Sequence, residues 1–313
     1  MCFAGHGNWP TGYPDAMPER LLQGVYVPLI TPFAADGSVA LDAIDRLCHE
    51  YLDAGCAGIV ALGTTGEATS LEADEQRAVI DRCAAACDER GAQLIVGAGS
   101  NNTSKTIAAV EALRGTAALA AALIVVPYYV RPSEAGIVEH FKAVAAASPV
   151  PLVIYNIPVR TGRNLGAESM LELAGTPNFA GLKQAQPALD AETLEILARA
   201  PREFSVLGGE DLVLFPITLM GGAGTISAAA HLCTNRFVAM IECGLAGKVD
   251  DGRTHAEALL PVVQAAYAEP NPSVFKGVLH AQGRIPTPDV RLPLVNAGTA
   301  SIDRALAAVD AAT

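Results

Sequence analysis

Eight short apolar runs alternate with helix-like stretches along most of this chain, and this alternation constrains the fold more than any other feature. The runs are rich in Val, Ile and Leu without strict polar alternation, as expected of parallel strands buried on both faces. Strand–helix alternation repeated eight times predicts an α/β fold, the (β/α)8 TIM barrel. The runs lie at residues 25–33, 58–63, 93–99, 121–129, 151–158, 179–185, 204–210 and 224–229.

An open doubly wound sheet is the alternative architecture for such a pattern. The Gly-x-Gly-x-x-Gly spacing of dinucleotide-binding sheets does not follow the first run, which argues against that alternative. About eighty residues with helical patterning follow the eighth run, more than one barrel helix needs. We therefore expect a loose tail over residues 1–19, a barrel over 20–235 and a C-terminal helical domain over 236–313. Helices are predicted at 41–54, 72–90, 103–113, 133–147, 166–174 and 191–200.

Charge and cysteine usage exclude several classes of function. The formal net charge is -12 and no lysine or arginine run is present, so we expect no nucleic-acid partner. No apolar stretch is long enough for a membrane span and no secretory signal is evident, so we expect no membrane contact. The seven cysteines form no Cys-x-x-Cys pair and the six histidines are scattered. These features predict a cytoplasmic protein without a metal site or a cofactor.

Lys183 is the strongest single candidate for chemistry. It lies in the apolar run 179–185, whereas the other four lysines lie in polar or helical stretches where their ammonium groups are expected to reach water. Burial disfavours the charged amine, lowers its pKa and favours the neutral nucleophile that attacks a carbonyl to form a Schiff base. The alternative is a lysine at a strand end whose ammonium extends to solvent.

Other polar residues follow the predicted strands, where barrel enzymes carry their chemistry. Thr64 and Thr65 lie in a Gly-Thr-Thr-Gly-Glu turn that can hold a carboxylate or a phosphate. Tyr155 lies in the terminal part of the fifth run and can transfer protons, and Arg160 can bind a carboxylate through two hydrogen bonds. The alternatives are a glycine turn with a threonine N-cap, and tyrosines that serve only packing.

Five segments together resemble the dihydrodipicolinate synthase family, within the class I aldolases that include N-acetylneuraminate lyase. The resemblance extends from about residue 20 to the C-terminus. The segments are Gly-Thr-Thr-Gly-Glu at 63–67, Pro-Tyr-Tyr at 127–129 followed by Arg-Pro, Tyr-Asn-Ile-Pro-Val-Arg-Thr-Gly at 155–162, Gly-Leu-Lys at 181–183, and Glu-Pro-Asn-Pro at 269–272.

The resemblance implies a homotetramer that condenses pyruvate with L-aspartate 4-semialdehyde. The product would be 4-hydroxy-tetrahydrodipicolinate, on the path to lysine and diaminopimelate. It implies that Lys183 is the Schiff-base lysine and Tyr155 the proton shuttle. Thr64 would link Tyr155 to Tyr129, and Tyr129 would come from a neighbouring subunit.

The resemblance also assigns residues to substrate binding. Thr65 would bind the carboxylate of pyruvate and Arg160 the carboxylate of the semialdehyde. Gly209 and Ile226 would line the pocket. The arginine at position 160 favours the synthase, because sugar-acid lyases of the group usually lack it.

Two departures from the family pattern leave alternatives open for the second substrate. The family commonly has Glu-Ala-Ser/Thr-Gly after the lysine, where this chain has Gln-Ala-Gln-Pro at 184–187, and it has Asp at the position of Glu210. A related aldolase, lyase or hydratase-aldolase acting on another aldehyde is the first alternative. A barrel that binds a keto acid without catalysis, and a phosphate site at residues 221–224, are further alternatives.

The resemblance further predicts weak or absent inhibition by L-lysine. In lysine-inhibited relatives a histidine pair and a glutamate are typical at the effector site. The corresponding positions here are Ala73, Gln76 and Lys105. A lysine cation at position 105 would repel the cationic side chain of the effector.

Overall fold

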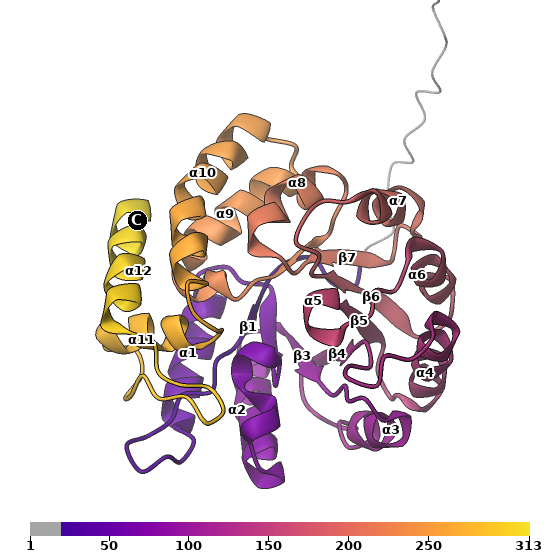
Figure 1. Ribbon diagram of the computed structural model, residues 1–313, viewed down its shortest axis with the longest axis horizontal. Helices are drawn as coiled ribbons and strands as arrows, with labels where there is room; N and C mark the ends of the chain where they lie inside the picture. Colours follow the sequence, from indigo (N-terminus) through magenta and orange to yellow (C-terminus); the bar gives the residue numbers. More distant parts are fainter. Residues whose placement is uncertain (1–19) are drawn as a thin grey trace, which may run out of the picture.

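A computed structural model describes residues 20–313, and their strands form one closed barrel in sequence order (Figure 1). Neighbouring strands are parallel throughout, and β1 also pairs with β8. The predicted (β/α)8 fold is therefore confirmed, whereas the predicted tail over 1–19 lies outside the described residues. The strands are β1 Gly24–Pro28, β2 Gly58–Ala61, β3 Gln93–Gly97, β4 Leu119–Val125, β5 Leu152–Asn156, β6 Phe179–Gln184, β7 Ser205–Gly208 and β8 Gly224–Ile226.

The strands are shorter than the apolar runs that predicted them, mostly at their carboxyl ends. Strand β1 ends at Pro28, although residues up to Phe33 remain buried. Strand β4 ends at Val125, so Tyr128 and Tyr129 lie in a loop. Apolar composition does not report ladder hydrogen bonding. At β1 buried loop residues extended the predicted strand, and at β4 the aromatic residues Tyr128 and Tyr129 did so.

Helices surround the barrel close to the predicted positions (Figure 1). Several start at side chains that accept the free N–H groups of the first turn, as at Asn102, Ser133 and Asp190. Pro158 was predicted to end a strand but begins a short helix, because proline fits the first helical turn. The helices are α1 Leu41–Asp53, α2 Ala73–Glu89, α3 Thr103–Glu111, α4 Glu134–Ala147, α5 Pro158–Thr161, α6 Ala167–Ala174, α7 Ala191–Arg199 and α8 Leu214–Leu219.

Four more helices complete the chain, α9 Thr234–Leu245, α10 Val249–Ala266, α11 Ser273–Ala281 and α12 Thr299–Ala312. Helix α9 follows β8 and contacts the barrel, while α10 packs between α9 and α12 (Figure 1). Over residues 20–313 no helix combines the length and apolar character needed to cross a bilayer. The domain division at residues 235 and 236 stays a prediction.

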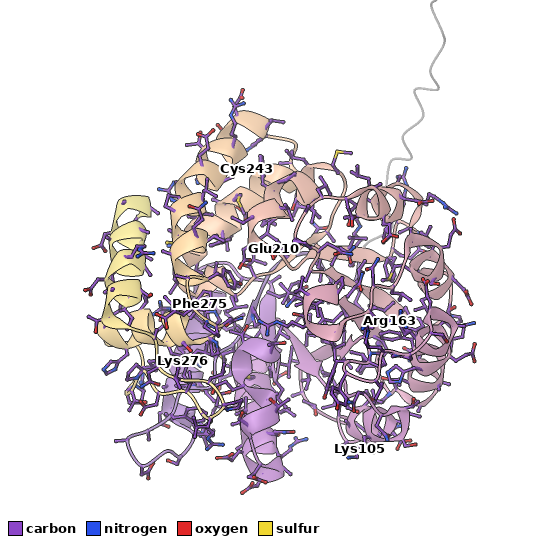
Figure 2. All side chains as sticks on the ribbon, in the orientation of Figure 1. Lys105, Arg163, Glu210, Cys243, Phe275 and Lys276 are labelled. Atoms are coloured by element: carbon purple, nitrogen blue, oxygen red, sulfur yellow. The ribbon has the colours of Figure 1, made fainter. Side chains whose placement is uncertain are left out.

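One sequence-based expectation about lysines is wrong. Lys276 was expected to reach water from a helical stretch, but it is fully buried on α11, where it pairs with Glu67. In Figure 2 it lies beside Phe275, where the C-terminal helices meet the barrel, far from Lys105 near α3. A helical pattern indicates which face of a helix is buried. It does not show whether that face meets a buried carboxylate that can pair with a lysine.

Candidate active site

Lys183 lies on β6 with its side chain in the barrel interior. It pairs in register with Tyr155 on β5, and its Nζ lies 4.3 Å from the centroid of the Tyr155 ring. Its neighbour Leu182 belongs to the core between the strands and the helices, so alternation turns Lys183 inward. Each of the two side chains is 7% exposed, so the ammonium does not extend into open solvent.

A cavity of about 290 Å³ lies over Lys183 at the carboxyl ends of the strands. Seven of the eight predicted site residues line it, and they come from strands or loops far apart in the sequence. The exception is Tyr129, which is 87% exposed in the loop after β4. The predicted residues in the lining are Thr64, Thr65, Tyr155, Arg160, Lys183, Gly209 and Ile226.

Gly209 makes room for the lysine side chain. A Cβ atom at this position would lie 2.9 Å from Cε and Cγ of Lys183 and 3.1 Å from Cβ of Ala185. Contacts this short would force the Lys183 side chain to shift. A glycine is therefore needed directly after β7 because a larger residue would clash with Lys183.

Thr64 and Thr65, from the Thr64–Gly66 turn, both line the cavity. Thr65 is buried, and its Oγ1 accepts a hydrogen bond of 3.0 Å from Nδ2 of Asn271. Because Asn271 occupies a lone pair of that oxygen, the hydroxyl hydrogen of Thr65 is free to donate toward the cavity. An oriented donor of this kind suits a carboxylate.

Arg160 lies on α5, directly after β5, and borders the cavity. Within residues 20–313 it forms no salt bridge, so its guanidinium is available to an anion. The planar group with its fixed donors suits a bidentate contact with a second carboxylate.

The sequence did not identify the wall that α10 and the following loop contribute. Gln264, Tyr267 and Asn271 all line the cavity. Tyr267 donates from its hydroxyl to Oδ2 of Asp211 at 2.7 Å, which connects α10 to the loop after β7. The only available signal was the Glu-Pro-Asn-Pro segment at 269–272, which marked Asn271 as part of a motif without giving it a role.

Glu210 adds an acidic group to the same wall. Burial, assisted by the negative charge of Asp211, raises the pKa of Glu210 above its ordinary value. Burial likewise raises the pKa of Asp211, against hydrogen bonds that favour its charged form. Within residues 20–313 no cluster of three His, Cys, Asp or Glu side chains could hold a metal ion.

Comparison with known proteins identifies this arrangement. Residues 21–312 match the Dihydrodipicolinate synthetase family. The chain belongs to this family. A curated relative, 4-hydroxy-tetrahydrodipicolinate synthase of Neisseria gonorrhoeae, is 38% identical over 291 residues, which cover 92% of this chain and 99% of the relative.

Solved structures of the dihydrodipicolinate synthetase family share the fold. The chloride-inhibited enzyme of Acinetobacter baumannii complexed with pyruvate superposes with a TM-score of 0.88 at 30% identity, covering 93% of this chain and 98% of that one. The enzyme of Cyanidioschyzon merolae with lysine bound gives a TM-score of 0.89 at 30% identity, covering 94% of this chain and 99% of that one.

The departure from the family pattern after Lys183 lies mostly outside the cavity. Among residues 184–187 only Ala185 lines it. Gln184 is buried behind β6, where its Oε1 accepts from Asn156 and its Nε2 donates to Thr193. The glutamine thus joins a buried hydrogen-bond network between the strands and α7. The departure that faces the cavity is Glu210.

A second cavity, of about 660 Å³, lies between α2, α3 and the loop after β4. The three positions on which the predicted weak inhibition by L-lysine rests, Ala73, Gln76 and Lys105, all line it together with Tyr128. Tyr155 and Arg160 border both cavities, so the two are neighbours. The cation at Lys105 therefore belongs to the cavity for which weak inhibition by L-lysine is predicted.

Proposed function

We propose that this protein condenses pyruvate with L-aspartate 4-semialdehyde to give 4-hydroxy-tetrahydrodipicolinate. The observation that carries the proposal is the placement of Lys183 inside the barrel, beside Tyr155. It lines one cavity together with Thr65 and Arg160, which can each bind a carboxylate. Family membership and a curated synthase that is 38% identical support the same reaction. Lysine and diaminopimelate biosynthesis in the cytoplasm would be its setting.

The neutral amine of Lys183 attacks the carbonyl carbon of pyruvate, and the carbinolamine loses water to give an imine. Loss of a proton from the methyl carbon gives an enamine, whose carbon attacks the aldehyde of the second substrate. The amino group of that substrate then attacks the imine carbon, which closes the ring and releases Lys183 as the free amine. Tyr155 stands beside the amine and serves as the acid–base group for these proton transfers. The hydroxyl of Thr65 holds the pyruvate carboxylate, with Ile226 and Gly209 shaping the cavity.

Tyr129 completes the site from a second copy of the chain. Its side chain is 87% exposed and the backbone there has φ of +70°, a conformation that non-glycine residues rarely adopt. An exposed, strained tyrosine followed by the exposed Val130 suits a surface that is covered on assembly. In this arrangement Thr64 lies between Tyr155 and the partner's tyrosine, and the assembly is a homotetramer.

A coupled assay with pyruvate and L-aspartate 4-semialdehyde, run beside a panel of other aldehydes, tests the proposal. We expect the semialdehyde to give the highest kcat/KM. A preference for another aldehyde would favour a related aldolase, and Glu210 would then be the first residue to change. Absence of turnover together with pyruvate binding would favour a keto-acid-binding barrel.

Arg160→Ala should raise the KM for the semialdehyde about 10- to 100-fold, because a charge-assisted bidentate contact is lost. The KM for pyruvate should change much less, since Thr65 holds that carboxylate. Arg199→Ala is the matched control, because it removes the same charge from an exposed ion pair with Glu168. Equal weakening of both substrates in Arg160→Ala would contradict the assignment.

Inhibition by L-lysine should be weak or absent at millimolar concentration. The cavity that would receive the effector carries Lys105, and two like charges in one cavity oppose binding. Initial rates with and without L-lysine measure this directly. Strong inhibition, or lysine bound beside Tyr128 in a crystal, would show the prediction to be wrong.

A further inference from the structure

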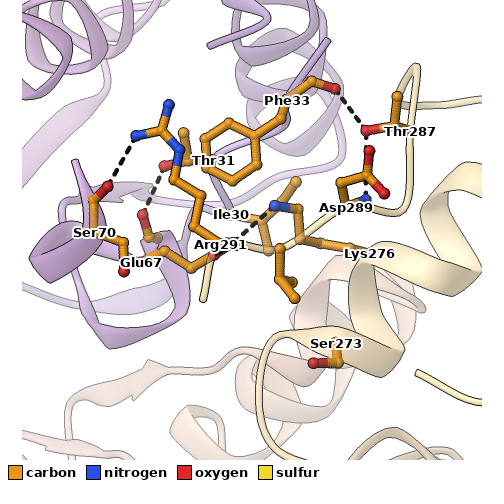
Figure 3. A network of polar contacts seen from close by, with 12 residues as sticks. Ile30, Thr31, Phe33, Glu67, Ser70, Ser273, Lys276, Thr287, Asp289 and Arg291 are labelled. Carbon is orange, nitrogen blue, oxygen red and sulfur yellow. Dashed lines mark hydrogen bonds and ion pairs between the residues drawn. The ribbon is translucent and has the colours of Figure 1, made fainter. Parts of the chain in front are cut away.

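Two oppositely charged side chains are fully buried where α11 meets the barrel. Lys276 and Glu67 have 0% side-chain exposure, and Nζ of Lys276 donates to Oε1 of Glu67 at 2.7 Å across a separation of 209 residues (Figure 3). Removing two charges from water commonly costs as much free energy as their attraction returns. A gain in stability is therefore a poor explanation for this pair, and its place in the fold suggests another.

Glu67 ends the turn that carries the two threonines of the site. It has φ of +53° and ψ of +33°, a left-handed conformation that is uncommon for a residue with a long side chain. Oε2 of Glu67 accepts the backbone N–H of Arg291 at 2.8 Å, while Lys276 occupies Oε1. Thr31 donates to the carbonyl of Gly66 at 2.7 Å. The carboxylate is thus fixed at both oxygens, and the backbone of the turn is fixed with it.

The Lys276 ammonium and the Arg291 side chain are themselves held in place. The Phe33 ring lies 4.0 Å from Nζ of Lys276 and 4.5 Å from Cζ of Arg291. Arg291 makes two further hydrogen bonds of 2.6 Å to Glu75 at the start of α2, and lowers the pKa of that carboxyl to about 2. Buried charges with this many fixed neighbours allow only one arrangement of the surrounding side chains and backbone. Specifying a single arrangement is the best attested role of buried polar groups.

The segment that supplies Lys276 also contacts the turn directly. Asn271 lies five residues before Lys276 and donates to Oγ1 of Thr65 at 3.0 Å. The C-terminal segment 271–291 therefore meets the turn at Thr65 and, twice, at Glu67. A shift of α11 would reach the hydroxyl that faces the cavity.

We propose that Glu67 and Lys276 are positioning residues, which fix the Thr64–Gly66 turn so that Thr65 meets the carboxylate of the keto acid in one orientation. The inference rests on the proposed function only in assigning the turn to that carboxylate. It makes α11 and the following loop a support for the substrate site, because Lys276 acts on the turn and does not itself line the cavity.

The opposing explanation is that the pair only attaches α11 to the barrel. Replacing one partner leaves an unpaired buried charge and destabilises the protein under either explanation, but replacing both removes that penalty. The double variant Glu67→Gln with Lys276→Met therefore separates the two. An attachment role predicts wild-type pyruvate binding once folding is restored, whereas a positioning role predicts that binding stays weak.

The experiment measures the pyruvate concentration needed for half-maximal borohydride trapping, together with kcat and hydrogen exchange of the backbone amides in residues 62–71. We expect the double variant and the shorter Glu67→Asp to need about 10- to 100-fold more pyruvate, with a smaller change in kcat. The amides of the turn should exchange faster in both variants. Glu67→Asp keeps both charges and changes only the reach of the carboxylate, so it provides a second variant if the double variant fails to fold.

Ser273→Ala is the matched control on the same helix. It removes the hydrogen bond of 2.7 Å from the Ser273 hydroxyl to the carbonyl of Val295, which lies outside the turn. Trapping and exchange should match the wild type in this variant. Wild-type trapping and wild-type exchange in the double variant or in Glu67→Asp would overturn the positioning role. If wild-type protein is not trapped by pyruvate, the proposed function is wrong, and the exchange of the turn alone decides the positioning role.

Discussion

Lys183→Arg and Lys183→Met should lose turnover by about 10⁴-fold or more, because removal of a covalent nucleophile eliminates the step on which the others depend. Arginine keeps the positive charge and much of the length, but its guanidinium stays protonated and cannot condense with a carbonyl. Methionine keeps the length of the chain without an amine. Loss of turnover in both variants would show that the reaction needs a nucleophilic amine at position 183 and not only a positive charge.

Peptide mapping after treatment with pyruvate and borohydride gives the second measurement. One pyruvate-derived mass should be found on the peptide that contains Lys183, and it should be absent from both variants. Lys142→Met is the control, since this lysine pairs with Glu172 at the surface. A label on another lysine, or unchanged turnover in Lys183→Arg, would show that Lys183 is not the nucleophile.

The barrel could be predicted because its strands are buried on both faces and so differ in composition from the helices between them. The ends of the strands could not. Residues 29–33 are as buried as β1 itself, yet only the hydrogen-bonding pattern decides that the strand stops at Pro28. The loop residues after each strand are the ones that carry the chemistry, so this uncertainty falls next to the site.

Lys183 could be found from sequence because a lysine in an apolar strand is rare, and rarity within a local pattern needs no knowledge of distant contacts. Lys276 shows the limit of the same argument. It lies in a helix where an exposed lysine is ordinary, and its partner Glu67 is 209 residues away. No local pattern reports a contact of that separation, so the contributions of Asn271, Tyr267 and Lys276 became evident only in the fold.

Tyr155→Phe should reduce kcat by about 10²- to 10⁴-fold, the usual contribution of a general acid–base group. The ring lies 4.3 Å from Nζ of Lys183, and phenylalanine keeps that ring. The change therefore removes the proton-transferring hydroxyl while leaving the packing around the amine intact. Steady-state rates and the stability of the folded variant are measured together.

Pyruvate binding separates a catalytic hydroxyl from a structural one. In Tyr155→Phe the trapped adduct on Lys183 should still form at saturating pyruvate, but more slowly, because formation of the imine also needs proton transfers. Tyr51→Phe is the matched control, since it removes a buried hydroxyl that binds Arg284 at 3.0 Å, on α1 and outside the cavity lining. A Tyr155→Phe rate within a few-fold of the wild type would assign Tyr155 to packing and leave the proton transfers to another group. Glu210 would then be the next candidate, because its carboxyl lines the cavity and its raised pKa favours the proton-carrying form.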